Sequence, residues 1–170
     1  MAGGRLLIVD DEKVALKNLE QVMKKAGYAV TATQSGGNAL ALLEKQPFDV
    51  VLSELRMDKV DGMQILRRCR ENHPDTEVIL VTGHATLASA VEAMKAGAYD
   101  FVGKPFNREH LLLTVRRALE SRSLKEEVRE LRRRTAGVER PIVMDSDAMR
   151  RVVDIADRVA RSDATVLVTG

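Results

Sequence analysis

The sequence predicts an α/β fold: a five-stranded parallel sheet, doubly wound, with helices on both faces. Two observations support this prediction. Short apolar runs alternate with amphipathic stretches from residue 5 to about residue 120. Each connection between successive runs is also long enough to hold a crossover helix. Strands and helices that alternate in this way form a parallel sheet covered by helices on both sides.

The first half of the pattern contains two strands and two helices. The segment "RLLIVDDE" (5–12) is an apolar strand that ends in acidic residues, and apolar residues then recur at helical spacing as far as the stop signal Gly27. The segment "YAVTAT" (28–33) predicts the second strand, and "GGNALALLEKQ" (36–46) predicts a short helix before Pro47.

The second half repeats the alternation. The third strand is predicted over "FDVVLS" (48–53) and the third helix over "DGMQILRRCRENH" (61–73). The fourth strand and helix are "TEVILVTG" (76–83) and "TLASAVEAMKAG" (86–97), and the fifth strand is "YDFVGKPF" (99–106). In a parallel sheet of this kind, ligands bind beyond the carboxyl ends of the strands, which is where site residues are expected.

The fifth helix is predicted to extend beyond the sheet domain. Asn107 can cap its start, and no Gly or Pro follows before about Arg134, so the helix could run for ~28 residues. Leu124, Val128 and Leu131 form an apolar seam at 4,3 spacing among charged residues, which favours a two-stranded coiled coil. The alternatives are a single helix that folds back on its own domain and a helix that frays in solution.

The last third of the chain indicates the start of another domain. "TAGVERP" (135–141) is a predicted linker, "SDAMRRVVDIADRVARSD" (146–163) is an amphipathic helix, and "ATVLVTG" (164–170) is a strand. One helix and one strand cannot bury a core. We therefore expect residues 141–170 to open a domain whose remainder is missing.

The composition fits a cytoplasmic protein with an aliphatic core. Hydrophobic residues make up 45% of the 170 residues, and aromatic residues only 3%. The 27 basic and 25 acidic side chains leave a net charge of +2, which argues against nucleic-acid binding through bulk charge. No stretch reaches the ~18 apolar residues of a membrane span, and the N-terminus lacks the apolar core of a signal peptide. Neither nucleic acid nor membrane is an expected direct partner.

The cysteine and histidine residues do not indicate a catalytic or zinc site. Cys69 is the single cysteine, so an internal disulfide is excluded, and its apolar helical position favours core packing. His73, His84 and His110 lack ligand spacing. No Ser or Cys is placed beside a His and an acid as in a hydrolase. We do not expect an enzyme.

Acidic residues follow two strands that are expected to be neighbours. Asp10 and Asp11 end the first strand, and Glu54 ends the third. Three carboxylates in one crevice repel one another and need a cation. Because all the ligands are oxygen atoms, the expected cation is Mg²⁺.

Two further strand ends supply groups that suit a phosphoryl ligand. Thr82 ends the fourth strand with a hydroxyl, and Lys104 ends the fifth with an ammonium group. Pro105 follows this lysine, so the peptide bond between them can be cis. Carboxylates, a hydroxyl and a lysine around one crevice form a site that handles phosphoryl groups.

These motifs resemble the receiver domain of bacterial two-component response regulators, which has a flavodoxin-like (βα)5 fold. The resemblance rests on "LIVDDE", "DVVLSELRM", "DG", "VTGHA" and "AGAYDFVGKPF" and covers residues 5 to about 120. It implies that Asp10 and Asp11 bind Mg²⁺ together with the backbone carbonyl of Arg56, and that a sensor histidine kinase is a partner.

The same resemblance assigns roles to the later strand ends. It implies that Thr82 and Phe101 are the switch pair that rearranges on phosphorylation, and that Lys104, followed by Pro105, contacts the phosphoryl group. It also implies a homodimer through the face formed by the fourth helix, fifth strand and fifth helix, continued by the linker helix.

The tail resembles the start of the AAA+ ATPase domain of NtrC-type activators of sigma-54 RNA polymerase. The resemblance rests on "IVMDSDAMRRVVDIADRVARSDATVLVTG", in which Gly170 would be the first glycine of the P-loop. The expected division is a receiver (1–120), a helical coiled-coil linker (121–140) and a fragment of the AAA+ domain (141–170). Contact with sigma-54 RNA polymerase would require the missing part of that domain.

The sequence departs from the receiver pattern at two positions. It has Glu54 where the family has the phosphoacceptor aspartate, and Asp58 where a proline is common. The extra methylene moves the carboxylate ~1.5 Å outward, so phosphorylation at position 54 is not expected. Two interpretations stay open. In the first, Glu54, whether natural or engineered, mimics phospho-aspartate. In the second, it pairs with Lys104 in a degenerate receiver that acts as a constitutive dimerisation or protein-interaction module.

Overall fold

The structure is a computed structural model that describes residues 3–136 and 146–159. Its contacts divide the chain into two units, Met1–Leu131 and Arg132–Gly170, and each is described by itself. Residues 121–131 of the predicted linker therefore group with the sheet domain. Among the described residues, no helix is both long enough and apolar enough to cross a membrane.

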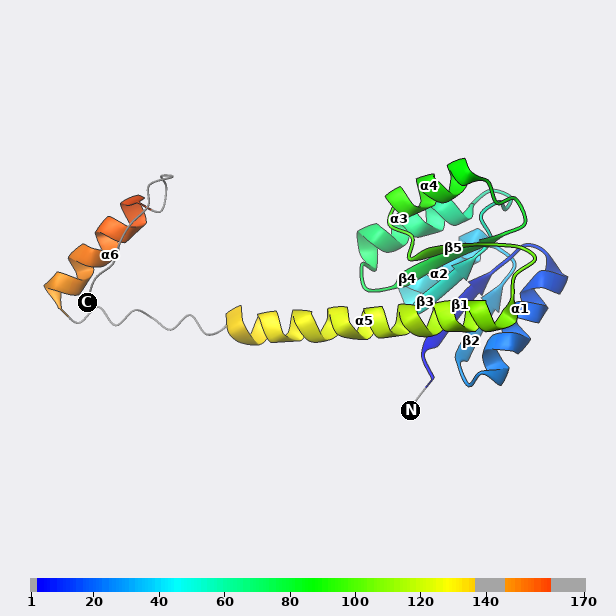
Figure 1. Cartoon of the computed structure of the whole chain (residues 1–170), viewed down its shortest axis with the longest axis horizontal. Helices are drawn as coiled ribbons and strands as arrows, with labels where there is room; N and C mark the ends of the chain where they lie inside the picture. The colour runs from blue at the N-terminus through cyan, green and yellow to red at the C-terminus, as the bar shows by residue number, and fades with distance from the viewer. Residues whose placement is uncertain (1–2, 137–145, 160–170) are drawn as a thin grey trace. The chain divides into compact units, whose positions relative to one another are not determined.

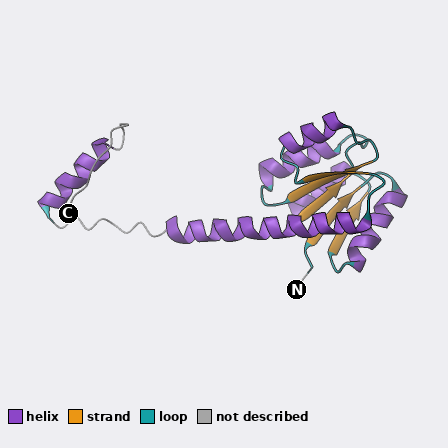
Figure 2. Cartoon of the chain, in the orientation of Figure 1, coloured by secondary structure: helices purple, strands orange, loops and turns teal. Residues whose placement is uncertain are grey.

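The sheet of the first unit has five parallel strands in the order β2-β1-β3-β4-β5, which confirms the predicted α/β class (Figures 1 and 2). The order turns back between β1 and β3, so the switch point of the sheet lies between these two strands. The strands are β1 (Arg5–Val9), β2 (Ala29–Thr33), β3 (Val50–Ser53), β4 (Glu77–Thr82) and β5 (Asp100–Gly103).

Helices cover both faces of the sheet. One face packs against α2, α3 and α4, and the other packs against α1 and α5. All six predicted helices are present, within a few residues of their predicted ends. They are α1 (Lys13–Lys25), α2 (Gly36–Lys45), α3 (Gly62–Asn72), α4 (Leu87–Lys95), α5 (Arg108–Ala136) and α6 (Asp147–Val159).

The apolar strand residues alternate between the two faces, as the strand period of two requires. In β1, Leu6 and Ile8 pack toward α1 and α5, whereas Leu7 and Val9 pack toward α2, α3 and α4. All four are fully buried. The sheet is therefore apolar on both sides, and polar site residues are left to the strand ends.

Local sequence signals set the ends of the helices. The side chains of Ser35, Asp61 and Thr86 accept hydrogen bonds from the first turns of α2, α3 and α4. Asn107 caps α5 as predicted, because its Oδ1 accepts from the backbone N–H of Glu109 at 2.8 Å. These caps are local, which is why the sequence predicted the helix boundaries well.

Helix α5 continues to Ala136, slightly beyond its predicted end near Arg134. Its first half is anchored by Leu111, Val115 and Ala118, which are fully buried against the sheet. The coiled-coil prediction for the second half concerns a second chain and stays a prediction.

Two further expectations concern Cys69 and the tail. Cys69, on the inner face of α3, is buried in the core as predicted, and burial raises the pKa of its thiol to about 11. The predicted helix in the tail is present as α6. The predicted strand 164–170 and Gly170 lie outside the described residues.

Gly62, the first residue of α3, packs directly against the chain that follows β3. A Cβ atom at this position would lie 2.3 Å from the carbonyl oxygen of Glu54 and 3.0 Å from the Cα of Leu55. We expect Gly62→Ala to lower the free energy of unfolding by about 1–3 kcal/mol, because backbone atoms must move. Urea unfolding monitored by circular dichroism measures this change.

Gly37 offers a matched control in α2. A Cβ there would meet only the Oγ of Ser35, at 3.7 Å, so Gly37→Ala should leave stability unchanged or raise it slightly. Equal stability of the Gly62→Ala and Gly37→Ala chains would contradict the assigned close approach.

Candidate functional site

The Lys104 ammonium joins two buried carboxylates at the carboxyl edge of the sheet. Its Nζ lies 2.6 Å from Oδ2 of Asp10 and 2.9 Å from Oε2 of Glu54. Asp10 is 1% exposed and Glu54 is 7% exposed. These residues follow β1, β3 and β5, and the pairing of Val9 with Ser53 in the β1–β3 ladder brings the first two together. Because β5 ends at Gly103, Lys104 follows the strand rather than ending it as predicted.

Every oxygen of the Glu54 carboxylate has a donor. Oε1 accepts from the backbone N–H of Leu55 at 2.8 Å and of Arg56 at 3.3 Å. Oε2 accepts from Lys104 at 2.9 Å. The negative charge at position 54 is therefore held by backbone and ammonium donors together.

The ionisation of the three charged groups follows from burial and from these contacts. Burial alone would raise the pKa of Glu54, but the hydrogen bonds from Thr82 and Lys104 outweigh burial, and the pKa is lowered. Burial also opposes the charge of Lys104, yet the bonds to Asp10 and Glu54 raise its pKa. For Asp10, burial dominates and raises the pKa, with Lys104 offsetting only part of the effect.

A hollow of about 220 Å³ lies beside this cluster. Asp11 is exposed at its rim, and Lys104 pairs with Asp10 and Glu54, so the three predicted carboxylates share the hollow although only two of them share the lysine. The residues that line the hollow are Asp10, Asp11, Glu12, Glu54, Arg56, Gly83, His84 and Lys104.

The donor set of the hollow fits Mg²⁺ better than a metal that needs a protein cage. Among the described residues, no group of three or more His, Cys, Asp or Glu side chains is placed to hold a metal ion. Mg²⁺ requires fewer protein ligands, because it keeps several water molecules and takes one or two carboxylates. Asp10 and Asp11 are two carboxylates that line the hollow.

The predicted switch residues lie at different depths. Thr82 is fully buried at the end of β4, and its Oγ1 accepts from the backbone N–H of His84 at 3.1 Å. Phe101 is half-buried in β5 and packs against the cluster on the α2–α4 side. Pro105 is exposed, and the Lys104–Pro105 peptide bond is cis.

Three site features escaped the sequence reasoning. Gly83 and His84 line the hollow, and the backbone N–H of Glu12 donates to Oδ1 of Asp10 at 3.0 Å. The signal for the first two was present, because they directly follow the strand-ending Thr82. Because His84 lacks zinc-ligand spacing, the sequence predicts no role for it.

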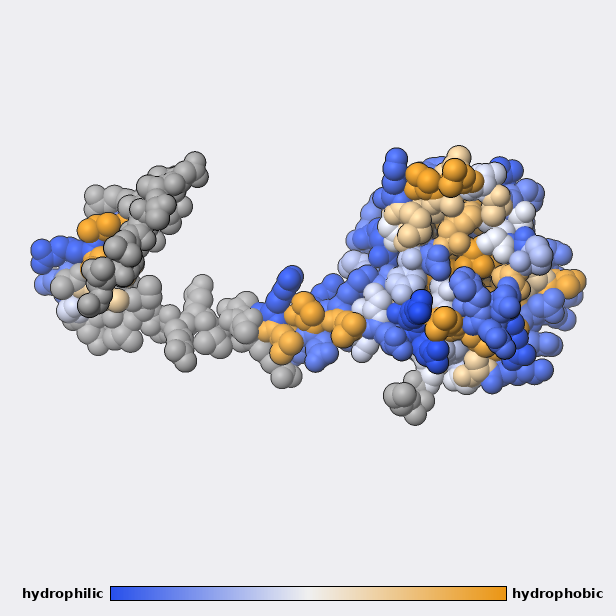
Figure 3. Space-filling model, viewed as in Figure 1, coloured by the Kyte–Doolittle hydropathy of each residue, from blue (hydrophilic) through white to orange (hydrophobic). Residues whose placement is uncertain are grey.

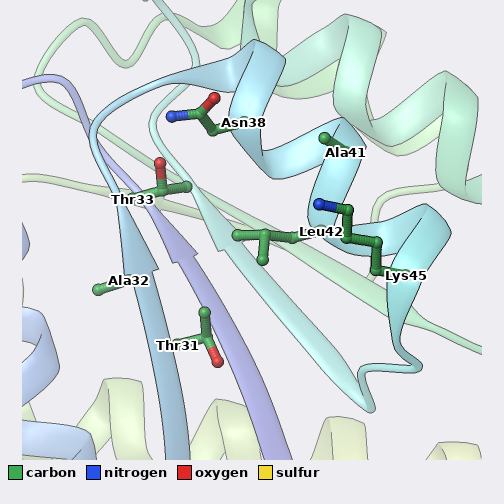
Figure 4. A pocket seen from close by; sticks show the side chains of 7 residues that line it. All are labelled: Thr31, Ala32, Thr33, Asn38, Ala41, Leu42 and Lys45. Carbon is green, nitrogen blue, oxygen red and sulfur yellow. The ribbon is translucent and has the colours of Figure 1, made fainter.

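Another hollow, of about 370 Å³, lies between edge strand β2 and α2 (Figure 4). Lys45 is the one charged residue in its lining, and none of the predicted site residues takes part. It therefore offers no second acidic or phosphoryl-binding cluster. Its lining is Thr31, Ala32, Thr33, Asn38, Ala41, Leu42 and Lys45.

Comparison with known proteins identifies the family. Residues 6–116 match the family described as the response regulator receiver domain. The chain is 35% identical, over 99% of its length, to the C4-dicarboxylate transport transcriptional regulatory protein DctD of Rhizobium meliloti, and it spans 37% of that relative.

Solved structures agree with this match. The crystal structure of NtrX from Brucella abortus in complex with ADP has a TM-score of 0.73 and 31% identity, over 95% of this chain and 36% of that one. The beryllofluoride-activated NtrC4 receiver domain dimer has a TM-score of 0.66 and 35% identity, over 69% of this chain and 98% of that one. The chain belongs to the response regulator receiver family, whose members generally bind Mg²⁺ at the phosphorylation site.

Proposed function

We propose that this chain is the regulatory receiver module of a two-component, sigma-54-dependent transcription activator. In this proposal it controls the dimerisation and assembly of an attached AAA+ ATPase, and Glu54 mimics phospho-aspartate. The observation that carries the proposal is the position of the Glu54 carboxylate, which accepts a hydrogen bond from the Lys104 ammonium at 2.9 Å.

The resemblance assigns this contact with Lys104 to a phosphoryl group. A phosphoryl group on a shorter aspartate would place anionic oxygens farther from the backbone of β3, and the longer Glu54 side chain places carboxylate oxygens there instead. Glutamate supplies one negative charge where a phosphate supplies about 1.5 to 2. The bias toward the signalling state is therefore expected to be partial.

Magnesium fits the acidic side of the same hollow. Asp10, Asp11 and the backbone carbonyl of Arg56 would hold the ion. When bound, it would neutralise charge on a phosphoryl group during transfer from a sensor histidine kinase. Lys104 orients the carboxylate at position 54 through the 2.9 Å contact.

The dimerisation surface is proposed on α4, β5 and α5, continued by the linker helix. Leu87 is 84% exposed on α4, with Val91 and Met94 also exposed, and apolar surface gathers over this helix (Figure 3). Phe101 of β5 connects this side to the site. A receiver dimer of this family is represented by the NtrC4 structure.

A second candidate function rests on the same ion pairs. Both Asp10 and Glu54 are bonded to Lys104, so the lysine has no need of a phosphoryl group. In this alternative the chain is a degenerate receiver, never phosphorylated, that acts as a constitutive dimerisation or protein-interaction module.

Molar mass in solution, measured by light scattering across a dilution series without phosphodonor, separates the two candidates. The chain with Glu54 is expected to dimerise about five- to tenfold more tightly than Glu54→Asp, since allosteric coupling is typically worth at least that factor. Glu54→Gln, which has nearly the same shape but no charge, serves as the control and should behave like the aspartate variant. Equal dissociation constants for all three chains would favour the degenerate receiver.

A further inference from the structure

Three acidic residues lie at the edge of the sheet opposite the site. Asp49 precedes β3, Glu77 begins β4, and Asp75 lies just before it. Because all strands are parallel, these amino-terminal ends share one edge, which we call the base of the receiver.

The linker half of α5 is bound to this base by three ion pairs. Lys125 Nζ lies 2.5 Å from Oε1 of Glu77, and Arg122 Nη1 lies 3.2 Å from Oδ1 of Asp49. Arg129 pairs with Asp75. We call this set of contacts the clamp; it consists of Asp49, Asp75, Glu77, Arg122, Lys125 and Arg129.

Glu77 is the strongest element of the clamp because it is 2% exposed. Its Oε1 also accepts from the Ser121 hydroxyl at 3.0 Å, and its Oε2 lies 3.9 Å from Nη1 of Arg70 on α3. A buried carboxylate is costly without cationic and hydrogen-bonding partners. Two of its three partners come from α5, so α5 must stay docked for this acid to remain satisfied.

The clamp and the apolar stripe occupy different sides of α5. Arg122, Lys125 and Arg129 have the spacing of one helix face. The stripe, formed by Leu124, Val128 and Leu131, is 61%, 46% and 52% exposed and lies about a third of a turn away at ~100° per residue. Docking to the base therefore leaves the stripe open to solvent.

We propose that the clamp makes the linker half of α5 a rigid extension of the receiver and holds its apolar stripe toward a second copy of this chain. The second copy is the occupant that the stripe fits, because Leu124, Val128 and Leu131 follow the 4,3 spacing of a coiled-coil seam. The receiver thereby sets the rotation of the linker helix about its own axis.

This arrangement gives the receiver mechanical control over the linker. A linker that frayed beyond Ala118 could form a coiled coil in any rotation and would not respond to the receiver. The three ion pairs of the clamp remove that freedom, because they join residues that are 48 to 73 positions apart in sequence. A shift of α5 at the dimer face therefore moves the stripe with it. The part of the inference that concerns the second copy rests on the proposed function.

The test is hydrogen exchange over residues 121–131 at a concentration where the chain is monomeric. Lys125→Met keeps the side-chain length but removes the charge. The amides of residues 121–131 should then exchange about three- to tenfold faster, because the variant loses a partly exposed ion pair with the buried carboxylate of Glu77. Glu77→Gln should have the same effect. Arg116→Met, which also removes one positive charge but at an exposed position of α5 outside the clamp, should leave the exchange unchanged.

The dimer dissociation constant completes the test. It should rise by a similar factor in Lys125→Met and Glu77→Gln. Unchanged exchange over residues 121–131 in both clamp variants would overturn the rigid extension, and faster exchange with an unchanged dissociation constant would overturn the positioning of the stripe. A chain that stays monomeric at every concentration would instead overturn the proposed function, while the exchange result would still decide whether the clamp holds α5.

Discussion

Replacing Glu54 with aspartate is expected to restore phosphorylation at position 54. Incubation with a small phosphodonor and Mg²⁺ should add the mass of one phosphoryl group to Glu54→Asp and leave the Glu54 chain unchanged. The difference in rate should be at least ~100-fold, because a misplacement of about 1 Å costs that much in an in-line transfer. Intact-mass spectrometry during the incubation measures the adduct.

The structure explains why the glutamate should not accept a phosphoryl group. Its carboxylate occupies the Lys104 donor, which an incoming phosphoryl group would have to use. The control is Glu54→Asp combined with Asp11→Asn, which keeps the acceptor but removes one proposed Mg²⁺ ligand and should lose the adduct. A phosphoryl adduct at position 54 of the Glu54 chain would contradict both the mimic and the degenerate receiver.

Replacing Lys104 with methionine is expected to destabilise the receiver. The change leaves two buried carboxylates, Asp10 and Glu54, without the cation that lies within 2.9 Å of each. We expect the free energy of unfolding to fall by about 2–4 kcal/mol without Mg²⁺, since breaking a buried ion pair leaves an uncompensated charge. Urea unfolding with and without Mg²⁺ measures the loss.

Magnesium should recover part of this loss, because a cation at Asp10 and Asp11 offsets the repulsion that Lys104 no longer relieves. Lys17→Met, at an exposed position of α1, is the matched control and should change stability by less than about 0.5 kcal/mol. The assigned role of Lys104 would be wrong if its variant were as stable as the Lys17 variant, and the Mg²⁺ assignment would be wrong if the ion stabilised neither chain.

The parts of the fold that depend on local pattern were predictable. The apolar runs, the caps such as Asn107 and the stop at Gly27 are signals carried within a few residues. They placed all five strands and six helices near their observed positions. The parallel order then brought the ends of β1, β3, β4 and β5 to one edge, which is why Asp10, Glu54, Thr82 and Lys104 could be grouped from the sequence.

The tertiary structure decided which of the grouped residues bond to one another. Lys104 joins Asp10 to Glu54, whereas Asp11 stays at the rim. These contacts depend on how far each side chain extends from the end of its strand. The predicted fifth strand runs to Phe106, whereas β5 ends at Gly103; Pro105, just beyond, is a local signal for that end.

The sequence by itself determined the fold class, the edge of the sheet that carries the site, and the length of α5. Only the tertiary structure decided where the linker half of α5 lies. In the sequence, Lys125 and Arg129 are only two of the charged residues around the apolar seam, and Glu77 is the second residue of a predicted strand. Their pairing joins residues 48 and 54 positions apart, and such contacts have no local pattern, because they arise only when the packed core brings the helix beside the base.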